Sequence, residues 1–343
     1  MSAKARIVAL GLAASLALSV LAGGAAAAKK VRAVNFHVLY LAPIFVAKEK
    51  GFFAKEGLDM EMIRVKAGRL ATTAILAGEA EFSTSSTIRE SVLVRRKGKK
   101  LIRIYSIANR MTMDLVVRND VIKKRKLSRD MPLMARFKAL KGLRIGVTAP
   151  GALTDVVSRY YLRRAGFNPN RDAQIIPLGG KNLAPAFRSG RIDAFMLSPP
   201  RPLWLERQGH GKIIIKSSAG DVPEFKNYEY TGTTVTQKWL DKNSESARAF
   251  CRAMNAANRA WRKDINVAID SAQKYFGYVP RDIIEISIRA LKASLSPDGI
   301  VKKSAVKQYM DFLNGFDPKR FPRQILDASE GIHFTNKFNP NAT

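Results

Sequence analysis

Short apolar strands alternate with short helices from residue 31 onward, and this alternation restricts the chain to a small group of folds. The pattern predicts a strand over residues 31–36, a helix over 44–50 and a second strand over 58–65. Two parallel strands can be joined only by a long crossover connection, which is usually a helix. The order of elements therefore predicts an α/β fold built on a largely parallel sheet.

The same plan recurs further along the chain. Glycines at helix ends and turns, and an acidic residue before a buried strand, have counterparts at nearly constant offsets. The matching pairs are Gly57 and Gly166 (109 positions apart), Gly78 and Gly190 (112 positions), and Glu81 and Asp193 (112 positions). We therefore expect two lobes of similar topology, with residues 29–117 in the first lobe and 118–232 in the second. Residues 233–343 are expected to return to the first lobe and to add C-terminal helices.

Two extended segments are candidates for the crossings between the lobes. Residues 115–117 are expected to leave the first lobe, and the threonine-rich residues 231–236 to return to it. After Ser244, apolar residues at helical spacing predict a long helix with one buried face. Cys251 lies on that face, which indicates a structural role in the core rather than a nucleophile. It is the only cysteine in the sequence, so no intrachain disulfide can form.

The first 28 residues have the pattern of a secretory signal peptide. Lys4 and Arg6 precede an uncharged apolar run over residues 7–21, and Ala28 ends a small-residue cleavage pattern. The run is shorter than the ~20 residues that a membrane-spanning helix needs. We expect residues 1–28 to be removed and the mature chain to be a soluble periplasmic protein, with an uncleaved membrane anchor as the alternative.

The charge of the chain is strongly positive. It has 59 basic and 28 acidic residues, a net charge of +31, and the mature chain without Lys4 and Arg6 keeps +29 (57 − 28). Such an excess is typical of proteins that bind nucleic acid or anionic membranes. Export, and the lack of aromatic residues interleaved with the basic ones, argue against nucleic acid. The densest basic cluster, residues 123–129 with a continuation to Lys141, predicts a solvated loop, with a docking patch for an acidic partner as the alternative.

Several segments together resemble the substrate-binding proteins of ABC importers, in the branch that serves nitrate, sulfonates, taurine and thiamine precursors. The segments are Leu41-Ala42-Pro43, residues 47–53 (AKEKGFF), 56–58 (EGL), 76–82 (LAGEAEF), 140–147 (LKGLRIGV), 150–151 (PG) and 163–166 (RRAG). The resemblance covers residues 31–200. It implies a two-lobed α/β periplasmic binding protein of the type II-like class, with a ligand cleft between the lobes and a helical C-terminal portion. It also implies an inner-membrane ABC permease as the partner.

Candidate ligand contacts follow from a rule that is independent of the family. In open α/β sheets, ligands bind beyond the carboxyl ends of the strands. The residues that follow predicted strands, in loops where the family also binds its ligands, are His37, Leu39, Tyr40, Gly68, Arg69, Ser85, Ser86, Thr87, Asn109, Arg110, Thr148, Gly151, Ala152, Leu153, Thr154 and Ser198. Each has a structural alternative, which is helix capping for the hydroxyl residues and a solvated surface position for the arginines.

The chemistry of these loops favours a small organic anion. Residues 148–154 precede a helix, whose free amides and positive end form a seat for an anion, to which Thr154 can add a hydroxyl. A guanidinium at Arg69 or Arg110 can pair with a carboxylate or sulfonate through two hydrogen bonds. Tyr40 and its apolar neighbours can instead frame an aromatic or heterocyclic ligand such as a thiamine-precursor pyrimidine.

The sequence predicts a binding protein rather than an enzyme. The three histidines, His37, His210 and His333, have no metal-ligand spacing and no cysteine partner, so we expect no metal or other cofactor. Phosphate-binding loops and nucleophile elbows are also missing from the sequence. We expect a monomer that captures its solute by hinge closure and delivers it to the permease. A subunit that presents its ligand to a sensor is the alternative.

Overall fold

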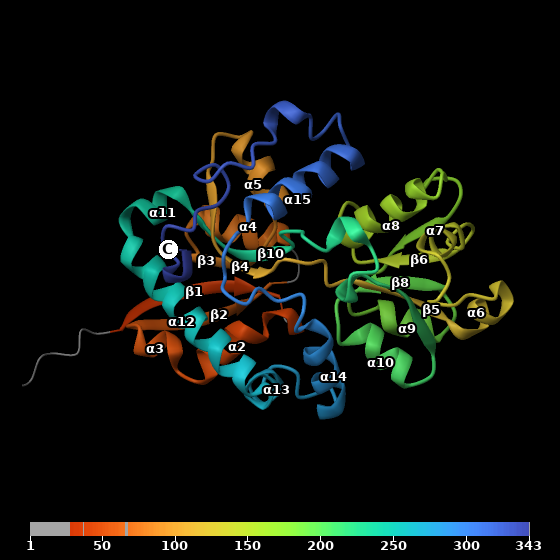
Figure 1. The fold of residues 1–343 in the computed structure, drawn as a ribbon, viewed down its shortest axis with the longest axis horizontal. Helices are drawn as coiled ribbons and strands as arrows, with labels where there is room; N and C mark the ends of the chain where they lie inside the picture. The colour runs from red at the N-terminus through yellow and green to blue at the C-terminus, as the bar shows by residue number, and fades with distance from the viewer. Residues whose placement is uncertain (1–27, 37, 66–67, 343) are drawn as a thin grey trace, which may run out of the picture.

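The computed structural model describes residues 28–36, 38–65 and 68–342, and for Gly68, Arg69, Ser85 and Ser86 the backbone alone. Residues 1–27 of the expected signal peptide, and His37, lie outside the described residues. The described chain forms two five-stranded sheets, ordered β2-β1-β3-β10-β4 and β7-β6-β8-β5-β9. Figure 1 shows the first sheet on the left and the second on the right. We call each sheet with its helices the first and the second lobe.

The first sheet is parallel except for one strand. Its strands are β1 (Lys29–Asn35), β2 (Leu58–Arg64), β3 (Phe82–Ser86), β4 (Leu101–Ala108) and β10 (Thr231–Thr236). β1 pairs in parallel with β2 and β3, whereas β10 lies antiparallel between β3 and β4. The antiparallel strand is therefore the one that comes back from the second lobe.

The second sheet has the same plan. Its strands are β5 (Asp114–Arg118), β6 (Arg144–Val147), β7 (Gln174–Pro177), β8 (Ala194–Leu197) and β9 (Gly211–Lys216). β6 pairs in parallel with β7 and β8, and β5 lies antiparallel between β8 and β9. Each lobe thus receives its antiparallel strand from the chain that has just left the other lobe.

The boundaries between the lobes differ from those expected. Residues 115–117, expected to leave the first lobe, belong to β5 and pair inside the second sheet. The first crossing is therefore the segment 109–113, between β4 and β5. The expected boundary after residue 232 falls inside β10, all of which lies in the first sheet. An apolar strand has the same local composition in either sheet, so only its pairing partners decide where it belongs.

Helices cover the faces of both sheets. In the first lobe they are α2 (Ala42–Glu49), α3 (Phe52–Lys55), α4 (Gly68–Ala77) and α5 (Ile88–Arg95), and in the second α6 (Asn119–Arg125), α7 (Leu133–Lys138), α8 (Leu153–Arg164), α9 (Leu183–Arg188) and α10 (Arg201–Arg207). The C-terminal part adds α11 (Gln237–Lys242), α12 (Ser244–Lys263), α13 (Ile265–Gln273), α14 (Arg281–Leu291) and α15 (Lys303–Phe316). Short 3-10 turns are η1 (Leu39–Leu41), η2 (Ser217–Ala219), η3 (Pro223–Phe225), η4 (Arg323–Ile325) and η5 (Pro340–Ala342). None of these helices is long and apolar enough to cross a membrane.

The basic segment that was predicted as a solvated loop is largely helical. It contains the C-terminal half of α6 and all of α7. Val121 on α6 and Phe137 on α7 are buried, which anchors both short helices on the second lobe. The helical pattern was not recognised in the sequence, because each helix buries only one face and most of its other residues are charged.

The expected repeat between the two lobes is visible in an arginine–carboxylate contact that each lobe makes once. In the first lobe the Glu81 carboxylate accepts the backbone amide of Arg32 at 2.6 Å and its guanidinium at 2.9 Å. In the second lobe the Asp193 carboxylate accepts the amide of Arg144 at 2.9 Å and its guanidinium at 2.6 Å. Both arginines and both acids are 112 positions apart. Each pair therefore joins one strand, β1 or β6, to the residue that precedes its parallel neighbour, β3 or β8.

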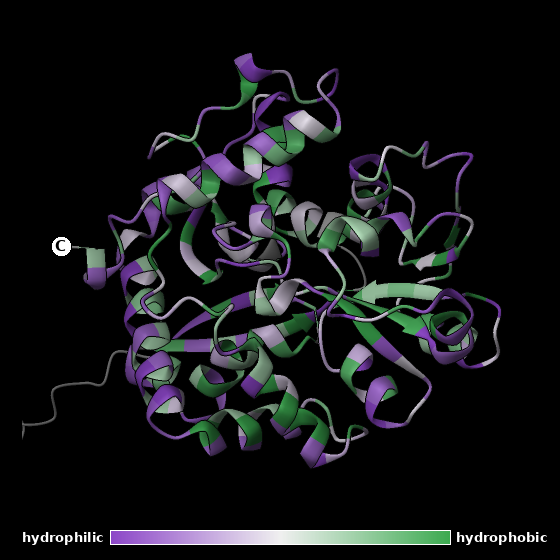
Figure 2. Ribbon diagram, turned by 45° about the vertical axis from the view of Figure 1, so that its right-hand side comes forward, coloured by the Kyte–Doolittle hydropathy of each residue, from purple (hydrophilic) through white to green (hydrophobic). Residues whose placement is uncertain are grey.

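The long helix α12 packs its apolar face on the first lobe, as the spacing predicts. Cys251 is fully buried there, and its thiol lies 3.5 Å from the carbonyl oxygen of Ile104 on β4. Burial raises the pKa of the thiol. In Figure 2 the hydrophobic residues gather in the strands and on the helix faces that cover them. The prediction of a structural cysteine is confirmed.

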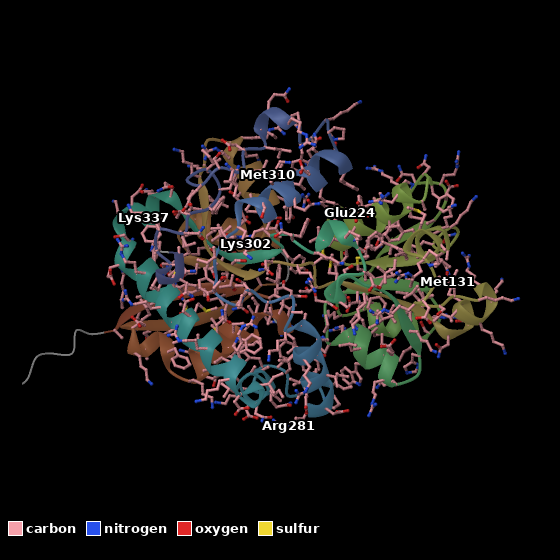
Figure 3. All side chains as sticks on the ribbon, in the orientation of Figure 1. Met131, Glu224, Arg281, Lys302, Met310 and Lys337 are labelled. Atoms are coloured by element: carbon pink, nitrogen blue, oxygen red, sulfur yellow. The ribbon has the colours of Figure 1, made fainter. Side chains whose placement is uncertain are left out.

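Helix α15 joins the two lobes along one side. The Tyr160 ring of α8 meets the Phe312 ring edge-on at 5.1 Å, and the Arg163 guanidinium lies 4.7 Å above the Phe316 ring. The Tyr160 hydroxyl also donates to Glu224 at 3.0 Å. Figure 3 shows Glu224 between the two sheets. A helix from the C-terminal part therefore contacts the second lobe directly.

Candidate functional site

The carboxyl ends of the parallel strands in the two lobes face each other. In the first sheet Thr231 opposes Ala108, which places the ends of β3 and β4 beside the start of β10. In the second sheet Asp114 opposes both Leu197 and Lys216, so the start of β5 lies at the carboxyl ends of β8 and β9. Because residues 109–113 join the two edges directly, the edges adjoin. This junction is where an open α/β fold binds ligands.

Aromatic and hydroxyl side chains from both lobes meet at the junction. The Tyr40 ring packs edge-on against Tyr230, with 5.5 Å between ring centroids. The Tyr230 hydroxyl lies 3.4 Å from Ser198 Oγ, which lies 2.7 Å from Thr112 Oγ1. Burial raises the pKa of both tyrosines, so their hydroxyls stay protonated. The structure thus places the predicted residues Tyr40 and Ser198 in one series of contacts, which runs from Tyr40 through Tyr230 and Ser198 to Thr112.

Thr112 and Tyr230 were missed by the sequence reasoning. Thr112 lies in the same crossing segment as the predicted Asn109 and Arg110 but further from the end of β4, and Tyr230 precedes a strand instead of following one. The signal that could have found them is the position of each next to a crossing: Thr112 is two residues before β5, and Tyr230 is one residue before β10. Residues at such positions must face the interlobe junction, whichever side chain they carry.

The loop before α8 differs from the predicted anion seat. The Gly151 amide donates to Asp155 Oδ2 at 2.7 Å, and Asp155 Oδ1 accepts Arg159 Nε at 2.6 Å. A carboxylate of the chain itself therefore occupies part of the seat, with its charge balanced by an arginine. Acidic side chains favour the first turn of a helix for the same reason as a bound anion does.

Thr154 also makes an internal contact. Its Oγ1 accepts the Thr148 amide at 3.0 Å and lies 2.9 Å from Thr148 Oγ1, and the Thr154 side chain is buried. The donors that remain at this end of α8 are the amides of Leu153 and Thr154, since the first amides of a helix have no acceptor within it. Ala152 is the N-terminal cap residue of α8 and is half-buried.

Asn109 and Arg110 lie at the centre of the junction. The Asn109 amide donates to the Ser294 carbonyl at 3.1 Å, and its own carbonyl accepts the Tyr228 amide at 2.9 Å. The two crossing segments and the loop after α14 are therefore bonded at one residue. Arg110 is half-buried, and its buried Nε has no hydrogen-bond partner among the described residues. This guanidinium donor is therefore left without an acceptor inside the described part of the protein.

The remaining predicted residues have mixed outcomes. Thr87 caps α5, since its amide donates to Glu90 at 3.0 Å and its hydroxyl bonds to the same carboxylate. Leu39 is fully buried in the core of the first lobe. His37 and the side chains of Arg69, Ser85 and Ser86 fall outside the described residues. Gly68 begins α4, which follows the carboxyl end of β2.

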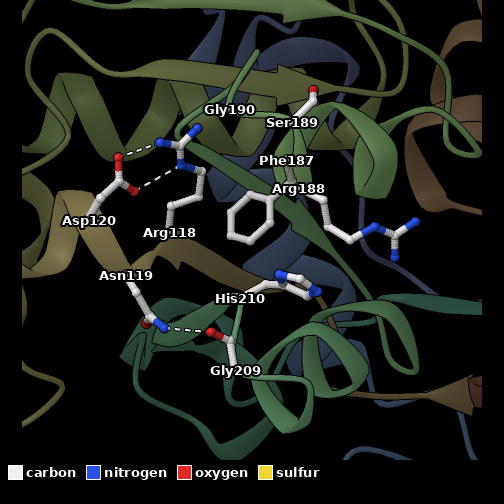
Figure 4. Close-up of a pocket in the computed structure, with 9 residues that line it drawn as sticks. All are labelled: Arg118, Asn119, Asp120, Phe187, Arg188, Ser189, Gly190, Gly209 and His210. Carbon is white, nitrogen blue, oxygen red and sulfur yellow. Dashed lines mark hydrogen bonds and ion pairs between the residues drawn. The ribbon is translucent and has the colours of Figure 1, made fainter.

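A separate cavity of about 310 Å³ lies at the opposite edge of the second lobe. Figure 4 shows its lining, which includes His210 and the ion pair of Arg118 with Asp120. Arg118 pairs with Gly211, so the cavity lies at the carboxyl end of the antiparallel strand β5, away from the interlobe junction. Within the described residues no cluster of histidine, cysteine and acidic side chains can hold a metal ion.

The comparison with known proteins now decides the family. The profile of the NMT1-like family matches residues 25–273. The chain belongs to the NMT1-like family. Its relatives include the putative binding protein YtlA of Bacillus subtilis (strain 168), which is 28% identical over 308 residues. The alignment covers 86% of this chain and 86% of YtlA. The nitrate/nitrite binding protein NrtA of Nostoc sp. (strain PCC 7120 / SAG 25.82 / UTEX 2576) is 26% identical over 259 residues.

The alignment with Nostoc NrtA covers only part of that protein, which limits what the similarity implies for this chain. The alignment with Nostoc NrtA takes in 71% of this NMT1-like chain but only 57% of NrtA, so this chain spans little more than half of that relative. Among solved structures, the periplasmic nitrate-binding protein NrtA from Synechocystis PCC 6803 has a TM-score of 0.69 at 17% identity, covering 90% of this chain and 86% of that one. The alkanesulfonate-binding protein SsuA from Xanthomonas axonopodis pv. citri has a TM-score of 0.66 at 16% identity, covering 87% and 96%.

These likenesses confirm the fold class and the family that the sequence motifs indicated. At such low sequence identity the solved structures support the fold alone. This fold is that of the two-lobed periplasmic binding proteins. The matched residues 25–273 take in both sheets and the first three C-terminal helices of the NMT1-like chain, together with the interlobe junction up to Tyr230.

Proposed function

We propose that this NMT1-like chain is the extracytoplasmic solute-binding component of an ABC importer, and that it captures a small organic anion between its lobes without chemical turnover. The observation that carries the proposal is the junction itself, where the carboxyl ends of both sheets adjoin and polar groups of both lobes meet. The nitrate/nitrite binding protein NrtA and the alkanesulfonate-binding protein SsuA, to which the chain is similar, support an anion as the ligand.

The connection between the lobes suits a hinge. Asn109 bonds to Tyr228 and Ser294, so the two crossing segments and the loop after α14 are joined at one point and can bend there together. A ligand that contacts both edges stabilises the closed arrangement by its differential affinity for that state. The permease then recognises the closed protein.

An anion would find two kinds of donor at the junction. The amides of Leu153 and Thr154 are at the positive end of α8, whose dipole contributes about 0.3–1 kcal/mol at an exposed site and about 2 kcal/mol at a partly buried one. Arg110 offers a guanidinium with an unsatisfied Nε. A hydrogen bond to a charged group contributes about 1.5–3 kcal/mol, so Arg110 is expected to contribute more than the helix end.

A second ligand class is favoured by one specific observation. Tyr40 and Tyr230 present an edge-on aromatic pair at the junction, and such a pair can pack against a planar heterocycle. Asp155 at the end of α8 also disfavours an anion nearby, since it already accepts the Gly151 amide. A pyrimidine ligand would use these two features and would not need Arg110.

Thermal unfolding of the mature chain with candidate ligands tests the proposal. Ligand at about 100 times its dissociation constant adds about 2.7 kcal/mol to the free energy of unfolding. We expect sulfonates, carboxylates or nitrate to stabilise the protein. Arg110→Gln is expected to weaken that binding about 10- to 100-fold, since it removes a charged hydrogen bond. Arg289→Gln, on the exposed face of α14, is the matched control and should leave the affinity unchanged.

The outcomes separate the ligand classes. Stabilisation by pyrimidines alone, unchanged in Arg110→Gln, would replace the anion by the heterocyclic ligand. An anion that stabilises both variants equally would remove Arg110 from the site. If no member of either class stabilises the protein, the proposed ligand chemistry is wrong.

The start of the fold supports export with removal of residues 1–28. Lys29 is the first residue of β1, and its amide already donates to the Gly57 carbonyl at 2.8 Å. Its side chain also bonds to Asn243 at 2.5 Å and Ser246 at 3.1 Å. A cut before Lys29 thus leaves the sheet complete. Intact-mass measurement of the exported chain should give an N-terminus at or near Lys29.

A further inference from the structure

The most basic segment of the chain is not used by the proposed ligand site. Residues 119–142 contain eight basic residues and two acidic ones. The segment forms α6 and α7, which Figure 1 shows at the outer end of the second lobe, on the side away from the first sheet. Figure 3 shows side chains that end in nitrogen projecting outward near the labelled Met131. This end of the molecule therefore carries a concentrated positive charge.

One arginine holds the two halves of the segment together. The Arg125 guanidinium at the end of α6 donates to the carbonyl oxygens of Ala139 and Lys141, at 2.8 and 2.6 Å. The C-terminal ends of α6 and α7 are thereby fixed side by side. This contact gathers five exposed lysines, which we call the lysine patch: Lys123, Lys124, Lys126, Lys138 and Lys141.

The charges of the lysine patch are largely not neutralised locally. None of its five lysines belongs to an ion pair in the described part of the chain. The two acids of the segment have other partners, because Asp120 pairs with Arg118 and Asp130 bonds to Ser128. The segment's other arginines, Arg129 and Arg136, point to Asp221 instead. The Lys141 ammonium lies 5.2 Å from the Phe167 ring centroid and close to the Asp172 carboxylate, so its charge is partly compensated. The remaining excess of positive charge on one surface attracts a polyanionic partner.

We propose that the lysine patch docks this protein reversibly on anionic lipid headgroups of the membrane that holds its importer; the location rests on the proposed function. Lysines are flexible point charges that suit a mobile array of phosphates, whereas a protein interface is typically built on aromatic or arginine anchors, and the patch has none. Met134 on α7 is exposed and lies one turn from Lys138, where it can enter the headgroup region. The purpose would be to keep the loaded protein close to the permease.

The affinity follows from the number of lysines. Each lysine near an anionic bilayer increases binding about fivefold at physiological salt, and the attraction falls off within a Debye length. Five lysines therefore give a large but salt-sensitive effect. Such docking holds the protein at the surface and still allows it to exchange.

Vesicle binding of the full mature chain tests the proposal. The probes are vesicles of phosphatidylglycerol mixed with phosphatidylcholine, and vesicles of phosphatidylcholine alone, at low and at high salt. A variant in which the five patch lysines become glutamine is compared with a control that loses five other exposed lysines: Lys50, Lys238, Lys242, Lys263 and Lys292. Both variants have the same net charge.

We expect the unchanged protein to bind the anionic vesicles at low salt only. The patch variant should bind at least about 100-fold more weakly, and the control no more than about fivefold more weakly. Equal losses in the two variants would show a general charge effect and overturn the assignment to the patch. Binding to polyglutamate but not to anionic vesicles would replace the lipid by an acidic protein. Ligand-induced stabilisation measured on the same patch variant reports separately on the interlobe site, so failure of one proposal is distinguishable from failure of the other.

Discussion

Replacement of Glu229 by glutamine is expected to lower the free energy of unfolding by about 3–5 kcal/mol, the usual effect of breaking a buried ion pair by removing one partner. Glu229 and Arg103 have side-chain exposures of 0% and 1%, and their charged atoms are 2.8 Å apart. The second carboxylate oxygen accepts the Ser106 hydroxyl at 3.0 Å. Glutamine has nearly the same shape, so the loss measures the guanidinium charge left in the core.

A matched substitution at the surface separates this effect from a general loss of charge. Glu285 and Arg289 form an ion pair at 2.7 Å with exposures of 40% and 56%, and Glu285→Gln is expected to change the free energy of unfolding by less than about 1 kcal/mol. Denaturant unfolding at neutral pH measures both variants. The double variant Arg103→Met with Glu229→Leu should recover much of the loss, because it leaves no buried charge. Equal effects of Glu229→Gln and Glu285→Gln would contradict the expected cost of the unpaired charge.

The position of this pair links stability to the proposed hinge. Arg103 lies on β4, and Glu229 lies in the crossing segment that leads to Tyr230 and β10. Gly232 on β10 leaves the space for the arginine, because a Cβ there would lie 2.8 Å from Arg103 Cδ and 2.3 Å from the Tyr105 carbonyl oxygen. The returning segment is therefore fixed to the first sheet immediately after the junction, which leaves the bending to the residues before it.

Local signals predicted many of the elements well. The predicted helix 44–50 and strand 58–65 agree with α2 (Ala42–Glu49) and β2 (Leu58–Arg64) to within two residues at each end. The family motifs and the 112-residue repeat indicated the two-lobed fold. These features depend on residues close together in the sequence, or on a pattern that occurs twice.

Features that depend on distant partners could not be predicted in the same way. The strand Asp114–Arg118 is apolar on both faces, and only its pairing with β8 and β9 places it in the second sheet. Thr112 and Ser198 are 86 positions apart, and no local pattern joins them. The contact between Tyr40 and Tyr230 is of the same kind.

The loop before α8 is an instructive intermediate case. Its place at a strand end was predicted, but its chemistry was read as an empty seat for an anion. Asp155 is four positions after Gly151 and four before Arg159, a spacing that places an acid in the first helical turn next to a basic partner. That signal was present in the sequence, and it points to an internal carboxylate.

Asp114→Asn is expected to make the protein more stable at alkaline pH, by at most about 4 kcal/mol, with little gain near pH 4. Asp114 is fully buried at the start of β5, and burial raises the pKa of its carboxyl group from 3.8 to about 7. The amide of Ser218 at 3.0 Å and its hydroxyl at 2.8 Å oppose that rise by donating to the carboxylate. Asparagine keeps an oxygen for the amide and cannot ionise.

The direction of the pH dependence follows from the number of protons bound in the folded and in the unfolded state. Between pH 3.8 and about 7 the folded chain holds a proton on Asp114 that the unfolded chain has released. The free energy of unfolding contributed by this group is therefore greatest below pH 3.8 and falls as the pH rises through 7. The asparagine variant lacks this decline, so the difference between the two proteins should widen between pH 4 and 8 and then stay constant.

Asp120→Asn is the matched control, because it is the same substitution a few residues away in an exposed side chain. The hydrogen bond from Arg118 lowers the pKa of Asp120, so its replacement should cause a small loss of stability that is constant from neutral to alkaline pH and disappears only in acid. Urea unfolding across pH 4 to 8.5 measures the three proteins. A constant difference between Asp114→Asn and the unchanged protein would mean that Asp114 is ionised throughout that range. The two Ser218 hydrogen bonds would then outweigh burial, and the carboxylate at the hinge end of β5 would be a permanent negative charge facing any anion bound at the junction.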